Sequence, residues 1–179
     1  MNRSMASSYT LPPVATLASS PQQLQEVLDH LFEPSPALYS LVASQLPRHF
    51  ADYAAFADWV AGLLRSGLRG DDETLLSILR AHPRLGAKRV DSVHSQAEQK
   101  SLAVADPDEA GRLLELNDEY ERTFPGMRYV VFVAGRSRPV IMQNMKERIA
   151  RGDIEAEKKE AIEAMRDIAK DRAAKLTPQ

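Results

Sequence analysis

Apolar residues recur at intervals of three and four along nearly the whole chain after Pro21, and this spacing constrains the fold more than any other feature. In an α-helix such residues fall on one face, which must be buried against another element. The stripes predict at least seven helices, at about 21–31, 38–46, 56–66, 72–82, 107–124, 138–151 and 154–176. We therefore expect an all-α, single-domain helix bundle.

One run departs from this spacing. Residues 129–133, Tyr-Val-Val-Phe-Val, have the composition of a β-strand. An isolated strand is not stable without a pairing partner, and the rest of the sequence offers none. We expect a short, extended and buried segment near 129–134.

The domain boundaries follow from the same pattern. Residues 1–20 contain Ser, Thr, Pro and Ala with little periodicity, which predicts a flexible lead-in, and residues 21–179 form the helical domain. A chain of 179 residues with 44% apolar and 27% charged residues is typical of one soluble globular domain.

Charge and cysteine content limit the classes of ligand. The 23 basic and 25 acidic residues nearly cancel, so we expect a small-molecule substrate, with no nucleic acid and no membrane as partner. The chain has no cysteine, which excludes disulfides and thiolate metal sites. We expect the cytoplasm, with the peroxisome left open although the C-terminal Leu-Thr-Pro-Gln is no peroxisomal address. The oligomeric state is not predicted, and a homodimer stays open.

His82 is the first residue placed against the pattern. It follows Ile78 and Leu79 at helical spacing, so it continues the apolar face of its helix just where Pro83 forces the chain to leave. A histidine in this place is either a structural core residue or a catalytic acid or base. The pattern alone favours the structural role.

Glu98 and Arg172 also have two interpretations each. Ser95-x-x-Glu98 has the form of a helix capping box, and the alternative is a carboxylate beside a catalytic imidazole. Arg172 lies on the core-facing stripe of the last helix, where its stem can be buried with the charge in water, or its guanidinium can bind an anionic or ureido group. No metal site is predicted, because His94 and Glu98 lack a third ligand.

Four short runs, taken in order, closely resemble motifs of the 2-oxo-4-hydroxy-4-carboxy-5-ureidoimidazoline (OHCU) decarboxylase family. They are His82-Pro83-Arg84-Leu85-Gly86, Ser95-x-x-Glu98-Gln99, Leu116-Asn117-x-x-Tyr120 and Val133-Ala134-Gly135-Arg136-Ser137. The resemblance covers about residues 22–176. It implies the family's all-helical bundle and a decarboxylation, without metal or organic cofactor, as the last step from urate to (S)-allantoin.

The resemblance also implies site residues. The family's catalytic residues correspond to His82, Glu98 and Arg172. Its substrate contacts correspond to Pro83, Ser95, Gln96, Ala97 and Gln99, and to the backbone of Tyr129, Val130, Val131, Phe132 and Val133. Our hypothesis is that His82 transfers the proton, Glu98 orients imidazole and substrate, and Arg172 binds the substrate's anionic or ureido end.

Two runs differ from the family's usual sequence and keep other functions open. Lys100-Ser101-Leu102 replaces a stretch with glycine and alanine, and 124–129 replaces the commoner Phe-Gly-Phe-Pro-Phe run. The alternatives are a family member that acts on another small anionic heterocycle and a helical binding module without catalysis. The binding module predicts that His82, Glu98 and Arg172 do not converge.

Overall fold

Seven α-helices and one 3-10 helix make up most of the computed structural model, which describes residues 9–66, 71–86, 94, 97–98 and 107–178. They are η1 (Val14–Ala18), α1 (Pro21–Phe32), α2 (Pro36–Ala43), α3 (Tyr53–Ser66), α4 (Asp72–Arg80), α6 (Pro107–Thr123), α7 (Arg138–Arg151) and α8 (Ile154–Leu176). No strand occurs among the residues that are described. The predicted all-α class is confirmed.

Side-chain caps fix several helix starts. Ser20, Ser35 and Asp71 each accept a hydrogen bond from a backbone N–H three residues ahead, which satisfies an amide that has no partner inside the helix. Asp153 does the same for two amides at the start of α8. Ser137 occupies the N-cap position of α7, but its side chain makes no cap hydrogen bond.

The second helix is shorter than predicted. It ends at Ala43 instead of continuing to Leu46. A residue that precedes proline is disfavoured in the α conformation, and Pro47 follows Leu46 directly. Leu46 still packs against the core from the following loop.

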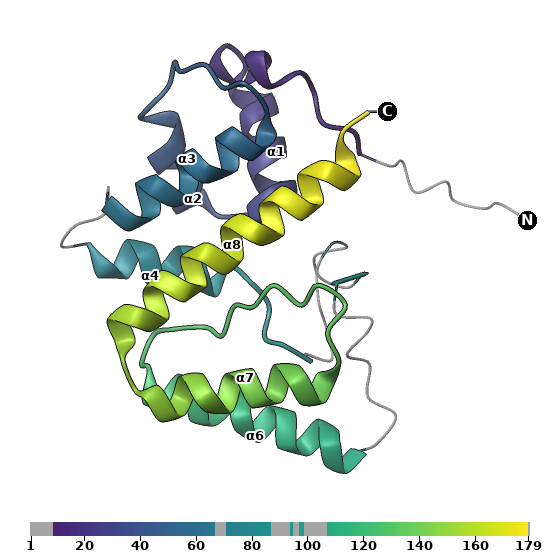
Figure 1. Ribbon diagram of the computed structural model, residues 1–179. Coiled ribbons are helices and arrows are strands. Elements are labelled where there is room, and N and C mark those ends of the chain that lie inside the picture. Colours follow the sequence, from purple (N-terminus) through teal and green to yellow (C-terminus); the bar gives the residue numbers. More distant parts are fainter. Residues whose placement is uncertain (1–8, 67–70, 87–93, 95–96, 99–106, 179) are drawn as a thin grey trace, which may run out of the picture.

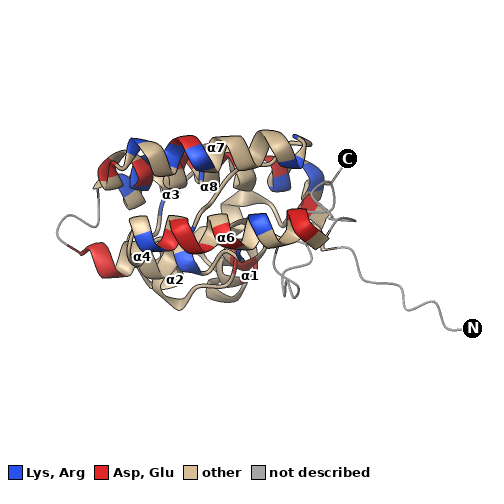
Figure 2. Ribbon diagram, turned by 90° about the horizontal axis from the view of Figure 1, so that it is seen from below, with Lys and Arg blue, Asp and Glu red and all other residues tan. Residues whose placement is uncertain are grey.

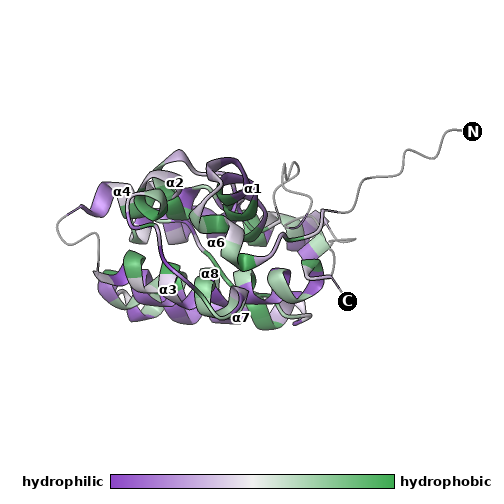
Figure 3. Cartoon of the chain, turned by 90° about the horizontal axis from the view of Figure 1, so that it is seen from above, coloured by the Kyte–Doolittle hydropathy of each residue, from purple (hydrophilic) through white to green (hydrophobic). Residues whose placement is uncertain are grey.

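Helix α8 is the central element. It crosses the molecule diagonally in Figure 1, with α1 and α3 packed on one side of it and the paired helices α6 and α7 on the other. Its buried stripe includes Ile162, Met165 and Ile168. Figure 3 shows hydrophobic and hydrophilic stretches alternating along the helices. None of the helices in the described ranges is long and apolar enough to span a membrane.

The described part of the expected lead-in is in contact with the core. Leu11 and Leu17 are only 3% and 2% exposed. The amide of Leu11 donates to the carbonyl of Leu176 at 3.0 Å, and the hydroxyl of Tyr53 donates to the carbonyl of Pro12 at 2.6 Å. This segment is therefore held by the start of α3 and the end of α8.

Residues 129–133 connect α6 to α7 and pass between α7 and α8 (Figure 1). Tyr129, Val130 and Val133 are buried, although the segment is no strand. Arginine side chains take the place of a neighbouring strand: Arg148 donates to the carbonyl of Val130 at 3.1 Å, and Arg136 to that of Val133 at 3.1 Å. Buried carbonyls need such donors.

Candidate active site

A cavity of about 460 Å³ lies between α8 and the segment 129–133. This volume suits a small organic molecule. The lining comes from the end of α4, from Ala97 and Glu98, from the connection between α6 and α7, and from the C-terminal half of α8. Every predicted site residue in the described ranges lines it: His82, Pro83, Ala97, Glu98, Tyr129, Val130, Val131, Phe132, Val133 and Arg172. Ser95, Gln96 and Gln99 lie outside the described residues.

His82 lies just past the end of α4 and is 4% exposed. Its carbonyl accepts a hydrogen bond from Arg128 at 2.8 Å, which fixes the backbone beside Pro83. Its Nε2 is buried and has no hydrogen-bond partner among the described residues. Such an unsatisfied buried nitrogen, on a side chain that lines the cavity, is a candidate ligand contact.

Burial lowers the pKa of His82 to about 4. The carboxylate of Glu33 opposes this shift, and the guanidiniums of Arg172 and Arg128 add to it. The imidazole is therefore neutral near pH 7. In this protonation state it can act as a proton acceptor or as a neutral N–H donor.

Arg172 joins two carboxylates at the floor of the cavity. Its Nε and Nη2 donate to the two oxygens of Glu98 at 2.9 and 2.6 Å, and Nη2 also donates to Glu33 at 2.9 Å. Arg172 is 3% exposed, so its guanidinium is buried and does not reach the solvent. Such a bidentate pair fixes the orientation of the carboxylate.

Glu33 was missed by the sequence analysis. It follows α1 with a φ of 75°, a conformation that costs free energy for a residue with a side chain. It is 2% exposed and 139 residues from Arg172 in sequence. Only the packing of α1 on α8 brings the two together. Glu33 thus combines an unfavourable backbone conformation with a buried ion pair to Arg172.

The expected contact between Glu98 and the imidazole takes a different form. Both oxygens of Glu98 accept from Arg172, so the carboxylate is held by the guanidinium. His82, Glu98 and Arg172 nevertheless line one cavity. The binding module without catalysis predicted that these three side chains do not converge.

Asp171 and Lys175 are further lining residues that the sequence analysis missed. They form an ion pair of 2.8 Å one helical turn apart. Helical spacing was the available signal: Lys175 lies three residues after Arg172, and Asp171 three residues after Ile168, and residues at this spacing share a helix face. Leu85, Ala134, Gly135 and Ile168 complete the lining.

No group of three or more histidine, cysteine, aspartate or glutamate side chains within the described ranges is arranged to hold a metal ion. His94, considered with Glu98 in the sequence, lies with its Nε2 at 2.9 Å from Nδ1 of His30. The ring of Tyr9 stacks on His30 at 3.7 Å.

The run after His82 is anchored to α6. Arg84 pairs with Asp118 at 2.6 Å, and the amide of Asn117 donates to the carbonyl of Leu85 at 3.0 Å. Gly86 has a φ of +72°, and a Cβ there would lie 2.5 Å from a methyl group of Leu113. These contacts fix the turn that carries the imidazole.

We expect Gly86→Ala to lower the free energy of unfolding by about 1–3 kcal/mol, because alanine is strained at positive φ and meets Leu113. Urea denaturation measures the change. Gly62→Ala is the matched control: it lies inside α3 with open space around the added methyl, and should stabilise by about 0.5–1 kcal/mol. Equal effects of the two changes would contradict the strain at Gly86.

The pKa of His82 also predicts a pH dependence of stability. Between pH 6.5 and about 4 the unfolded chain binds a proton at His82 and the folded protein does not. Unfolding therefore takes up a proton, and the free energy of unfolding falls as the pH falls through this range, by up to about 3 kcal/mol. Urea titrations of wild type and His82→Gln at several pH values should give a shallower slope for the variant. Parallel slopes would exclude a depressed pKa.

Comparison with known proteins gives two kinds of match. A family model described as OHCU decarboxylase matches residues 18–174. The uric acid degradation bifunctional protein PucL of Bacillus subtilis (strain 168) is 28% identical over 157 residues, which are 87% of this chain and 30% of that protein. The uric acid degradation bifunctional protein of Bacillus sp. (strain TB-90) is 29% identical over 119 residues, 65% of this chain and 23% of that protein. The chain thus spans less than a third of either relative.

Proposed function

This chain belongs to the OHCU decarboxylase family, and from this premise we propose that it converts 2-oxo-4-hydroxy-4-carboxy-5-ureidoimidazoline to (S)-allantoin and CO2 in purine degradation. One observation carries the proposal: His82, Glu98 and Arg172 line a single cavity of suitable size, inside the region that matches the family. The reaction draws on the chain's own residues, without metal or organic cofactor.

The chemistry needs one acceptor for electrons and one mobile proton. When the 4-carboxylate leaves as CO2, its bonding electrons form a double bond between ring carbons 4 and 5, and the π electrons of the neighbouring C=N bond move onto the nitrogen. The resulting nitrogen anion takes one proton from solvent. The 4-hydroxyl then becomes a carbonyl as its proton is transferred to the adjacent ring carbon, which completes allantoin.

His82 suits this proton transfer. Its neutral imidazole can accept the proton of the 4-hydroxyl through the unpartnered Nε2 and return it to the ring carbon from one face. Transfer from one fixed side is what makes a single enantiomer. A protonated imidazole could not take the first of these steps.

Glu98 and Arg172 act as a unit in this proposal. Arg172 keeps Glu98 oriented, and Glu98 can accept hydrogen bonds from the N–H groups of the ureido substituent. The guanidinium is already paired to Glu33 and Glu98, so its main part is to position Glu98. This changes the role first expected for Arg172, which was to bind the substrate directly.

The wall opposite α8 supports ring binding. Within the described part of the chain, the backbone amides of Val130, Val131 and Phe132 donate no hydrogen bond. The carbonyls of Val130 and Val133 accept hydrogen bonds from arginine side chains. Amide donors left over in a cavity wall fit the carbonyl oxygen of a five-membered ring.

The test uses freshly generated OHCU, with allantoin followed by circular dichroism. The protein should accelerate the decay and give an optically active product, whereas the spontaneous reaction gives a racemate. Decay at the spontaneous rate would refute the proposal. Thermal-shift measurements with allantoin add a check that needs no turnover, because a ligand that binds the folded state raises its melting temperature.

A further inference from the structure

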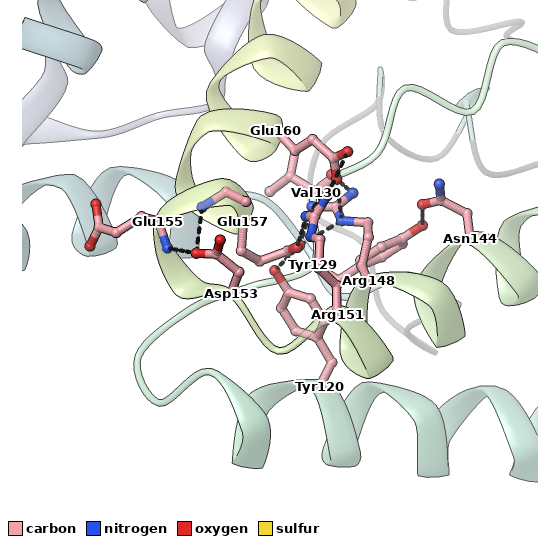
Figure 4. Close-up of polar contacts among 11 residues, drawn as sticks. Tyr120, Tyr129, Val130, Asn144, Arg148, Arg151, Asp153, Glu155, Glu157 and Glu160 are labelled. Atoms are coloured by element: carbon pink, nitrogen blue, oxygen red, sulfur yellow. Dashed lines mark hydrogen bonds and ion pairs between the residues drawn. The ribbon is translucent and has the colours of Figure 1, made fainter.

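A buried ion cluster lies behind the wall of the cavity, where α6, α7 and α8 meet (Figure 4). Arg148 of α7 and Glu157 of α8 are 5% and 0% exposed, and they form an ion pair. The hydroxyl of Tyr120 donates to Glu157 at 2.7 Å. Neither Arg148 nor Glu157 lines the cavity.

Arg148 reaches the cavity wall from behind. Its Nη1 donates to the carbonyl of Val130 at 3.1 Å, and its guanidinium lies 4.7 Å from the centre of the Tyr129 ring. The hydroxyl of Tyr129 donates to Asn144 of α7 at 2.6 Å. The two residues that begin the wall are thus fixed to α7 by side chains.

Stability alone gives little reason for this cluster. A buried ion pair costs nearly as much in desolvation as it gains in attraction, and apolar residues of the same volume often stabilise a fold equally well. The segment 129–133, however, has no neighbouring strand to fix its position. A planar guanidinium can bind a carboxylate and a carbonyl at once in a fixed geometry.

We propose that Arg148, held by Glu157, is a positioning residue that sets the place of the 129–133 backbone relative to His82. It does not touch the ligand. Through Val130 it determines how closely the wall fits the ring that the site binds. The identity of that ring rests on the proposed function, but the fixing of the wall does not.

Arg151 supplies a matched control. It lies one turn after Arg148 on the same helix. It pairs with the other oxygen of Glu157 at 2.9 Å and with Glu160 at 3.3 Å. It makes no contact with 129–133 among the described residues. A residue that only stabilises the cluster should behave like Arg151.

The central variant is Arg148→Lys. A lysine keeps the charge but has no fork, so it cannot hold Glu157 and Val130 in the same geometry. We expect kcat/KM for OHCU to fall about 10²-fold, mainly through a rise in KM, because a displaced 129–133 backbone no longer contacts the substrate ring in the right geometry. Arg151→Met should lower the melting temperature and leave KM unchanged. A KM that stays at the wild-type value in folded Arg148→Lys would overturn the proposal.

A second variant removes the buried charges together. Arg148→Met with Glu157→Met replaces the ion pair by apolar side chains of similar size, so the fold should persist even if Arg148→Lys does not. The carbonyl of Val130 still loses its donor. The double variant should therefore show the same rise in KM. A normal KM in a stable double variant would refute a positioning role.

A measurement without turnover separates this proposal from the proposed function. Methyl NMR order parameters of Val130, Val131 and Val133 report how firmly the wall is held. They should fall in Arg148→Lys and in the double variant, and stay unchanged in Arg151→Met. If the wild type fails to decarboxylate OHCU but these parameters change, the proposed function fails and the positioning role stands. Unchanged order parameters would overturn the positioning role.

Discussion

His82→Gln should lower kcat for OHCU decarboxylation by about 10²- to 10⁴-fold while the protein stays folded. Glutamine keeps a neutral, hydrogen-bonding side chain in the same place but cannot accept and return a proton near neutral pH. The imidazole Nε2 has no hydrogen-bond partner among the described residues, so no such bond of the fold is lost with it. Stopped-flow mixing with fresh substrate, with allantoin detected by circular dichroism, measures the rate.

The matched control for this prediction is His49→Gln. His49 is exposed in the loop between α2 and α3 and does not line the cavity. Its replacement should leave kcat unchanged. If His82→Gln decarboxylates at nearly the wild-type rate, the proton transfer has been assigned to the wrong residue.

The helices were largely predictable because their signal is local. The bounds of α8 agree with the predicted range 154–176, since an aspartate cap and a long apolar stripe define it within the sequence itself. The end of α2 was predicted too late, because apolar Leu46 continues the spacing although the chain must change direction before Pro47.

The outline of the cavity was also predictable, but its ion pairs were not. Helical spacing places Arg172 on the buried face of α8, and the same spacing from Ile141 and Met145 would have indicated Arg148 on α7. Their partners Glu33 and Glu157 come from other elements, and pairing across helices depends on how these pack. Val140, which directly precedes the buried Ile141 on α7, is 50% exposed.

Surface charge explains why these buried acids were hard to find. Acidic and basic residues alternate along α6 and α7 in Figure 2, and most of them are solvated. Glu157 has the same sequence surroundings as the exposed Glu155 and the half-buried Glu160 but is itself fully buried. Its environment comes from Tyr120 and Arg148, which lie 37 and 9 residues away.

Arg172→Met should lower the free energy of unfolding by about 3–5 kcal/mol and abolish decarboxylation. The change removes the guanidinium that pairs with the buried carboxylate of Glu33 and frees Glu98 from its fixed orientation. Urea denaturation and the decarboxylation assay measure the two effects. Lys175→Met, one turn along α8, removes an exposed ion pair and should change stability by less than about 0.5 kcal/mol.

Adding Glu33→Gln to Arg172→Met separates the two effects. The neutral amide removes the buried negative charge that Arg172 no longer offsets, so much of the lost stability should return. Activity should not return, because Glu98 still lacks the guanidinium that orients it. If stability and activity recover together, Arg172 acts only through the fold. If stability alone recovers, the guanidinium has a separate part in the reaction, which is to hold Glu98 toward the substrate.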